Sequence, residues 1–381
     1  MGDFFNLLFS TLHDSTIILY TSIFIISSIL GFKCQKKEWY GTQKINRIIF
    51  FLLFLFLCVF YAFNDVGIDT QHYRYYFDIY KDTISLDDGY GSVERLYQLL
   101  NIGLHYLISD SFWAVAIIRT LQLALFFYAL YLLRDKTIIG FSIMAYVAFF
   151  YFDAFNLLRS SLAGSLSLLS FAYIHKRNNI LGFVTALLAM GFHTSAILLV
   201  LTIGLYFLCY ETILAKFQKA TFILAIILFI IILVVGIDYI NILLSNDFNG
   251  GRYENYTTSS NSIGLFILLK YFPAIIVFYL LKVNKSNLSN HYWLNLNFVW
   301  LIVGFAIALL AYNIGILTRV AIYFSTPFLF LIPFFCIQLL YKKSSNYKLI
   351  RLLFIVYFTY MYVGTMGGLY NISGLGPFKF F

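Results

Sequence analysis

Apolar runs separated by short polar segments dominate the pattern of this chain. Twelve runs approach or reach the length at which a helix crosses a membrane, about 20 residues. The pattern predicts an all-α, polytopic integral membrane protein with about twelve transmembrane helices in one domain, residues 1–381. Two runs, 180–192 and 196–210, are short and can instead form a re-entrant hairpin. The runs lie near residues 16–32, 48–63, 111–133, 137–152, 159–174, 180–192, 196–210, 220–243, 263–281, 294–311, 319–341 and 352–366.

Composition agrees with this class of protein and excludes others. Hydrophobic residues make up 61% of the chain and charged residues 11%, whereas soluble domains carry about 25% charged residues. The net charge of +9 is spread over short clusters between apolar runs, so no nucleic acid partner is predicted. The four cysteines form no CxxC motif, and neither a disulfide framework nor a metal site is predicted.

The basic residues predict the orientation of the chain. Six alternate loops hold 17 of the 26 lysines and arginines, which marks their side as the cytoplasm. Both termini are then outside, and so are two sizeable loops, 64–110 and 244–262. The predicted cytoplasmic loops are 33–47, 134–136, 175–179, 211–219, 282–293 and 341–351.

The first outer loop ends in an amphipathic segment, residues 94–109. Apolar and polar side chains separate onto opposite faces at helical spacing. A helix of this kind is expected to lie on the membrane surface rather than to cross it. The apolar face carries Leu96, Leu99, Leu100, Leu104, Leu107 and Ile108, and the polar face carries Glu94, Gln98, Asn101 and His105.

The basic residues outside the cytoplasmic loops differ in kind. Six of these nine are arginine, against four of the seventeen on the cytoplasmic side. The planar guanidinium group binds phosphate or carboxylate through paired hydrogen bonds, so the bias indicates an anionic substrate at the outer face. Ordinary ion pairs in outer loops also explain it. The six are Arg74, Arg95, Arg119, Arg159, Arg252 and Arg319.

Two of these arginines lie in apolar surroundings. Arg159 begins a run in DAFNLLRSSLAGS, and the small residues after it would let another helix approach closely and fix its position. Snorkelling toward water is the alternative for this side chain. Arg119 lies about eight residues into its run, where ionisable side chains usually face a cavity or a partner. It can bind substrate or pair with an acid.

Two other segments bring polar residues to the same predicted outer edge. Arg319 lies in YNIGILTRVAIYF, with Asn313 before it and Tyr323 one turn later on the same helical face. His193 lies in AMGFHTSAI, between two short runs. It can donate a hydrogen bond to a sugar or phosphate, act as a base, or serve only as a structural residue.

The outer loops add candidate acids and two more arginines. Asp69, in VGIDTQHYRYYF, can act as general base on a sugar hydroxyl, and Glu94 is a further choice. The alternative is that both are solvated loop acids. Arg74 follows in the same stretch, and Arg252 stands at the centre of the second outer loop.

The order of four motifs resembles the EpsG-type, Wzy-like polysaccharide polymerases. The motifs are VGIDTQHYRYYF, FNLLRSSLAGSL, ALLAMGFHTSAI and NIGILTRVAIYF, and the terminal GLGPFKF is similar to the outward tail of that family. The resemblance implies a GT-C-like membrane fold that polymerises undecaprenyl-diphosphate-linked oligosaccharides at the outer face of the bacterial cytoplasmic membrane. It also implies membrane lipid, a chain-length regulator and a flippase of the same pathway as partners. Asp69, Arg159, His193 and Arg319 match the polar positions of the family.

We therefore expect a membrane glycosyltransferase that uses no cofactor and no metal. Its product, whether O-antigen, capsule or exopolysaccharide, stays open. The alternatives are a transporter or flippase of a lipid-linked or anionic saccharide, which the deeper Arg119 and Lys270 favour, and a non-catalytic partner of an export complex. The expected catalytic residues are Asp69, His193 and Glu94, and the expected diphosphate-binding residues are Arg159, Arg319, Arg119, Arg252, Arg74, Tyr323 and Asn313.

Overall fold

The described part of the chain is almost entirely helical. A computed structural model describes residues 15–36, 44–79, 93–210, 263–283, 291–310, 317–341 and 346–372, with Leu375 and Phe378. Within these ranges the only strands are two short segments, β1 (Gln35–Lys36) and β2 (Lys44–Ile45), which pair antiparallel. The prediction of an all-α protein is confirmed.

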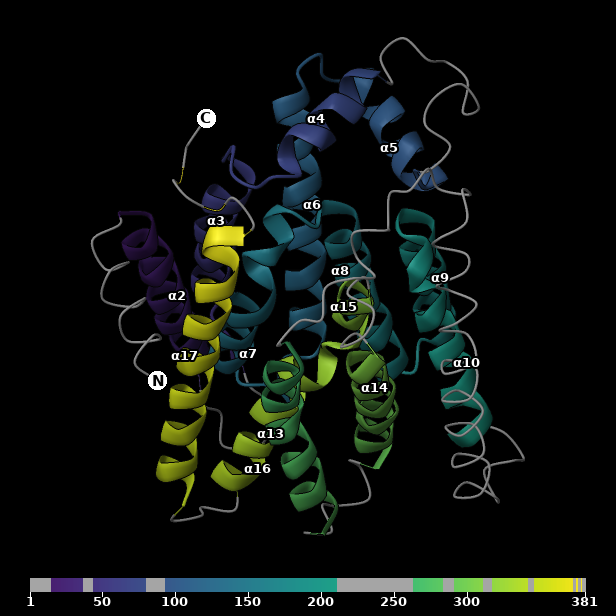
Figure 1. Ribbon diagram of the computed structural model, residues 1–381. Helices are drawn as coiled ribbons and strands as arrows, with labels where there is room; N and C mark the ends of the chain where they lie inside the picture. Colours follow the sequence, from purple (N-terminus) through teal and green to yellow (C-terminus); the bar gives the residue numbers. More distant parts are fainter. Residues whose placement is uncertain are drawn as a thin grey trace.

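The helices form an upright bundle that is covered at one end by two helices lying across it, α4 and α5 (Figure 1). The chain passes twice through short π-helical turns, η2 and η9, inside otherwise helical stretches. The helices are α2 (Ser15–Lys33), α3 (Arg47–Ala62), α4 (Thr70–Ile79), α5 (Arg95–His105), α6 (Ser111–Leu132), η1 (Arg134–Lys136), α7 (Ile139–Tyr146), η2 (Val147–Tyr151), η3 (Asp153–Phe155), α8 (Leu158–His175), α9 (Asn179–Phe192), η4 (Thr194–Ala196), α10 (Ile197–Tyr210), α13 (Ile263–Val283), α14 (His291–Leu310), α15 (Leu317–Val320), η8 (Ala321–Phe324), η9 (Pro327–Leu331), α16 (Ile332–Tyr341) and α17 (Tyr347–Ile372).

The bundle has the lengths and apolar character of a polytopic membrane protein. Every apolar run of the sequence that falls within the described residues forms a helix. The run at 220–243 and the second outer loop, 244–262, lie outside the described residues, so the count of twelve spans stays a prediction. In the described part of the chain, five stretches are long and apolar enough to cross a membrane: Ser15–Lys33, Ser111–Leu132, Tyr292–Leu309, Ala321–Leu339 and Tyr347–Met366. Shorter apolar helices cover Arg47–Ala62, Ile139–Tyr151, Asn179–Phe192 and Thr194–Leu208.

A buried arginine on α6 ties three segments together. Arg119 has 0% of its surface exposed. Its Nη1 donates to the backbone oxygen of Asn64 at 3.0 Å and to Asn64 Oδ1 at 3.3 Å. Its Nη2 donates to Thr70 Oγ1 at 2.9 Å and to the Phe155 carbonyl at 3.2 Å. Since buried charges persist where hydrogen bonds compensate them, this network fixes the end of α3, the start of α4 and the turn before α8 against α6.

The first outer loop contains one helix that the sequence analysis missed. The loop prediction overlooked α4, where Tyr73, Tyr76 and Phe77 are buried at helical spacing. The predicted amphipathic helix is present as α5. Its polar Gln98 and Asn101 are buried against the protein, whereas Leu99 is 48% exposed. This outward-facing apolar side suits contact with lipid.

Small residues on α8 bring η8 close, as the small-residue spacing predicts. A Cβ added to Gly164 would lie 2.6 Å from Cγ2 of Ile322, and Ser167 Oγ donates to the Tyr323 carbonyl at 2.7 Å. The close approach of α8 and η8 therefore depends on Gly164, and this approach helps to position Tyr323.

We expect Gly164→Val to destabilise the fold, because the added side chain would collide with Ile322. Overpacking of this kind costs about 1–3 kcal/mol. Thermal unfolding in detergent measures the loss. Gly204→Val on α10 is the matched control, since nothing lies within 4 Å of a Cβ there, and equal losses in both variants would contradict the close-packing argument.

We expect Arg119→Leu to lower the free energy of unfolding by about 3 kcal/mol or more, because buried acceptors at Asn64, Thr70 and Phe155 lose their donors. Denaturant titration in detergent measures this change. The exposed Arg95→Leu serves as control with a change within about 0.5 kcal/mol. A similarly small change for Arg119→Leu would show that the network contributes little.

Candidate functional site

Glu94 joins an arginine and a histidine from two other segments. It stands just before α5, and its side chain makes no cap hydrogen bond to that helix. Its Oε2 forms a close ion pair with Nη1 of Arg159, near the start of α8. Its Oε1 lies 3.5 Å from Nδ1 of His193, between α9 and η4, and accepts from the Thr194 backbone N–H at 3.3 Å. The carboxylate thus connects three separate stretches of chain.

Ser195 and Tyr323 complete this group. Ser195 Oγ lies 3.0 Å from His193 Nδ1 and 3.1 Å from the Tyr323 hydroxyl. The Tyr323 side chain, from η8, is buried and meets the His193 ring edge-on. We call Glu94, Arg159, His193, Ser195 and Tyr323 the Glu94 cluster. The sequence analysis missed Ser195, although its place two residues after His193 in FHTSAI was the available signal.

The environment of His193 keeps its imidazole neutral. Burial lowers the pKa of His193, Glu94 opposes this, and the charges of Arg159 and Arg319 lower the pKa further, so it lies below its usual value. Nδ1 of this neutral imidazole faces Ser195 and Glu94, so the other ring nitrogen, Nε2, can accept a proton. The shift also shows that Arg319 lies near enough to act on the cluster.

Tyr73, on α4, brings Asp69 and Arg319 into the same region. Burial raises the pKa of Tyr73; the charges of Arg159 and Arg319 lower it, and that of Asp69 raises it. Three charges from separate segments therefore surround one phenol. The Tyr73 hydroxyl donates to the backbone oxygen of Asn156 at 3.1 Å, which holds α4 against the turn before α8.

A glycine turn sets the position of Asp69. Gly67 has φ of +106°, a conformation that glycine adopts readily, and a Cβ there would lie 2.7 Å from Asn156 Oδ1. The same Oδ1 accepts from the Asp69 backbone N–H at 3.3 Å. The side chain of Asn156 therefore fixes the backbone that carries Asp69 beside the turn leading to Arg159.

The structure places two other predicted residues elsewhere. Arg74 forms an ion pair with Asp65 at 3.1 Å and lies over the Phe112 ring, 5.1 Å from its centroid. Arg119 is enclosed in the network that fixes α6. Both positions favour a structural role over phosphate binding. Arg252 and Asn313 lie outside the described residues.

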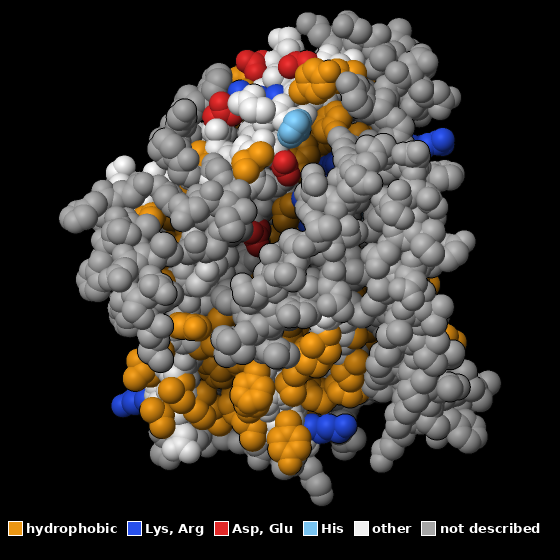
Figure 2. All heavy atoms as spheres, in the orientation of Figure 1, with side chains coloured by type: hydrophobic (Ala, Val, Ile, Leu, Met, Phe, Trp, Pro, Cys, Tyr) orange, Lys and Arg blue, Asp and Glu red, His pale blue; other side chains and the backbone are white. Residues whose placement is uncertain are grey.

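Acidic and histidine side chains lie toward one end of the face that Figure 2 shows, with basic side chains near them. Mainly hydrophobic side chains lie below, and further basic side chains lie at the lower edge. Within the described ranges, no group of three or more His, Cys, Asp or Glu residues is arranged to hold a metal ion. The side chains of the Glu94 cluster can transfer protons and bind anions.

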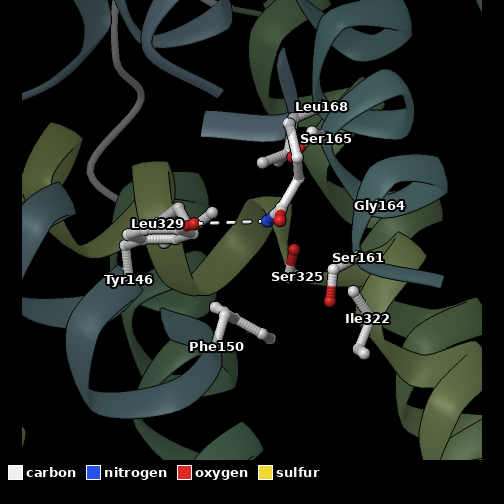
Figure 3. A pocket seen from close by; sticks show the side chains of 10 residues that line it. Tyr146, Phe150, Ser161, Gly164, Ser165, Leu168, Ile322, Ser325 and Leu329 are labelled. Atoms are coloured by element: carbon white, nitrogen blue, oxygen red, sulfur yellow. Dashed lines mark hydrogen bonds between the residues drawn. The ribbon is translucent and has the colours of Figure 1, made fainter. Parts of the chain in front are cut away.

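A small cavity with a mainly apolar lining lies beside α8 (Figure 3). Its volume of about 20 Å³ suits a single water molecule and excludes a sugar. Gln122 Nε2 donates to the Tyr146 hydroxyl at 3.5 Å at its edge. None of the residues that line this cavity belongs to the Glu94 cluster. The lining residues are Gln122, Tyr146, Phe150, Ser161, Gly164, Ser165, Leu168, Ile322, Ser325 and Leu329.

Comparison with known proteins gives one match. No curated protein and no solved structure matches this chain. The EpsG family matches residues 47–373, which include Asp69, Arg319 and all of the Glu94 cluster. Because this match covers most of the sequence, the protein belongs to the EpsG family.

Proposed function

We propose that this protein is a membrane glycosyltransferase that joins undecaprenyl-diphosphate-linked oligosaccharide units at the outer face of the bacterial cytoplasmic membrane. Membership of the EpsG family indicates a membrane protein of exopolysaccharide biosynthesis. The polymerase activity, the outward orientation of the site and the termini, and the pathway partners named above are parts of the proposal.

The observation that carries the proposal is the meeting of Arg159, Glu94 and His193, with Arg319 close by. A neutral histidine can accept a proton, and two guanidinium groups can bind a diphosphate. Glycosyl transfer from a lipid diphosphate needs these two functions in one place. Arg159 on α8, Arg319 on α15 and His193 between α9 and η4 would supply them.

In the proposed reaction a sugar hydroxyl of one lipid-linked unit attacks the anomeric carbon of another. The new carbon–oxygen bond forms as the bond to the diphosphate oxygen breaks, and the electron pair leaves with the polyprenyl diphosphate. The hydroxyl proton passes to a base. Arg159 and Arg319 stabilise the charge that grows on the diphosphate, a contribution of roughly 3–4 kcal/mol for one well-placed donor.

The geometry favours His193 as the base and Glu94 as the group that orients it. Glu94 Oε1 and Ser195 Oγ both face Nδ1 of the imidazole, so Nε2 is the nitrogen directed at substrate. Arg159 binds Glu94 through Nη1, and a diphosphate would share its guanidinium with that carboxylate. Asp69 is the second candidate base, because it lies near the same Tyr73 phenol as Arg159 and Arg319.

A flippase for a lipid-linked saccharide is the second candidate function. Lys270, within the apolar helix α13, is the observation that favours it, since transporters place polar groups deep in the membrane. Purified protein supplied with lipid-linked oligosaccharide in nanodiscs separates the two, because a nanodisc has no second compartment. Longer saccharide chains support the polymerase, and their absence counts against it. Transfer of the lipid-linked saccharide between the leaflets of protein-containing liposomes would then support the flippase.

We expect Arg159→Ala and Arg319→Ala each to reduce chain lengthening by about 100-fold or more, because each removes a cation from the departing diphosphate. The measurement is gel analysis of products made by purified variants in nanodiscs. Arg95→Ala, at an exposed position on α5, is the matched control and should keep full activity. Normal chain lengths from both site variants would remove the arginines from the mechanism.

We expect activity to fall as the pH drops through the lowered pKa of His193, below about 6.5, because protonation removes the base. The pH profile of kcat/KM measures this acid limb. In Arg319→Gln, the residual activity should begin to fall at a higher pH, because a charge that lowers the pKa of His193 is lost. A limb that persists in His193→Gln and disappears in Asp69→Asn would assign the base to Asp69 instead.

A further inference from the structure

Lys270 places a cation inside the bundle, away from the Glu94 cluster. Its Nζ lies 4.6 Å from the ring centroid of Phe150, 4.9 Å from that of Phe149 and 5.4 Å from that of Phe328. These distances allow cation–π attraction. The Tyr357 hydroxyl donates to the Lys270 backbone oxygen at 3.1 Å and so fixes this point of α13 against α17.

Asp153, in η3, is the charge that faces Lys270. Lys270 Nζ lies against the rings of Phe149 and Phe150, and Asp153 follows these two residues within about one turn, so the two charged groups lie in the same region. Burial raises the pKa of the Asp153 carboxyl to about 6, and the Lys270 charge opposes that rise. Among the described residues, however, no ion pair joins them and no hydrogen bond reaches the carboxylate. An acid and a lysine in apolar surroundings thus lie in one region without a direct ion pair, and ionisable groups in such surroundings usually mark a functional site.

The turn between η2 and α8 links this pair to the Glu94 cluster. Asp153 begins the turn and interacts with Lys270 on α13, whereas Arg159, six residues later, binds Glu94 before α5. The two charged groups therefore lie on either side of one short stretch of chain. A reaction that joins two lipid-linked units needs one binding place for each of the two headgroups.

We infer that Asp153 and Lys270 form a second binding site, which holds the diphosphate headgroup of the other lipid-linked saccharide. This inference rests on the proposed function. The Lys270 ammonium binds phosphate oxygens, and Asp153 accepts a hydrogen bond from a hydroxyl of the attached sugar. The three phenylalanine rings suit the apolar chain next to the diphosphate.

Counting bound lipids tests the site without using activity. The full-length protein is purified, supplied with undecaprenyl diphosphate, and examined by native mass spectrometry. We expect two bound lipids for the unchanged chain, one for Lys270→Met, one for Arg159→Met and none for the double variant. Lys282→Met is the matched control, because Lys282 lies on the same helix near two phenylalanine rings, and it should keep two.

Two outcomes would overturn the second site: one bound lipid that only Arg159→Met removes, or two bound lipids that survive in Lys270→Met. We expect both lipids to stay bound when inorganic diphosphate is added in excess. If inorganic diphosphate displaces the lipid at Asp153 and Lys270, this second site binds a free anion and not a lipid headgroup. If both lipids bind as expected but no chain grows, the polymerase proposal fails and the second site stands. If chains grow while only the Arg159 site holds lipid, the polymerase proposal stands and the second site is rejected.

Asp153→Asn tests the sugar contact and guards against misfolding of the lysine variant. We expect this variant to bind bare undecaprenyl diphosphate at least as tightly as the unchanged chain, because a negative charge beside Lys270 is lost. Its affinity for the saccharide-bearing lipid, relative to the bare lipid, should fall about tenfold or more. An unchanged ratio would remove Asp153 from the site.

Discussion

The candidate site depends on a buried guanidinium that is not part of it. Arg119 holds the end of α3, the start of α4 and the turn before α8 on a single side chain. Tyr73, Asp69 and Arg159 all lie on segments that this network positions. In a membrane bundle the hydrophobic effect gives little specificity between helices, so a buried polar group that donates four hydrogen bonds is an effective way to fix their relative placement.

Helix α8 organises what surrounds the network. Its first turn carries Arg159 to Glu94, while Gly164 and Ser167 bring η8 and Tyr323 against its middle. The turn before it carries Asp153 toward α13. Acid, base and cation therefore come from elements far apart in the sequence but adjacent to one helix. A site built on a packed helix keeps its geometry better than one built on loops alone.

The sequence predicted the helices well because a membrane protein must bury its backbone polar groups in long apolar helices. Arg159, His193 and Tyr323 were identifiable because polar groups beside apolar runs stand out. The contacts of Glu94 were not predictable, because it is one of seven acids in one loop and its neighbours in the sequence do not distinguish it from Asp69. The helix α4 carries a helical spacing of Tyr73, Tyr76 and Phe77 that was readable within a mainly polar loop, whereas the partners of Arg119 depend on tertiary contacts that composition and spacing do not encode.

The placement of Glu94 at the start of α5 has a consequence for how the protein is handled. That helix buries Gln98 and Asn101 in the protein and exposes Leu99, so one part of its surface faces the medium around the bundle. Glu94 directly precedes this helix and contacts Arg159 and His193. The choice of detergent or lipid around α5 is therefore an experimental variable in any measurement on the Glu94 cluster.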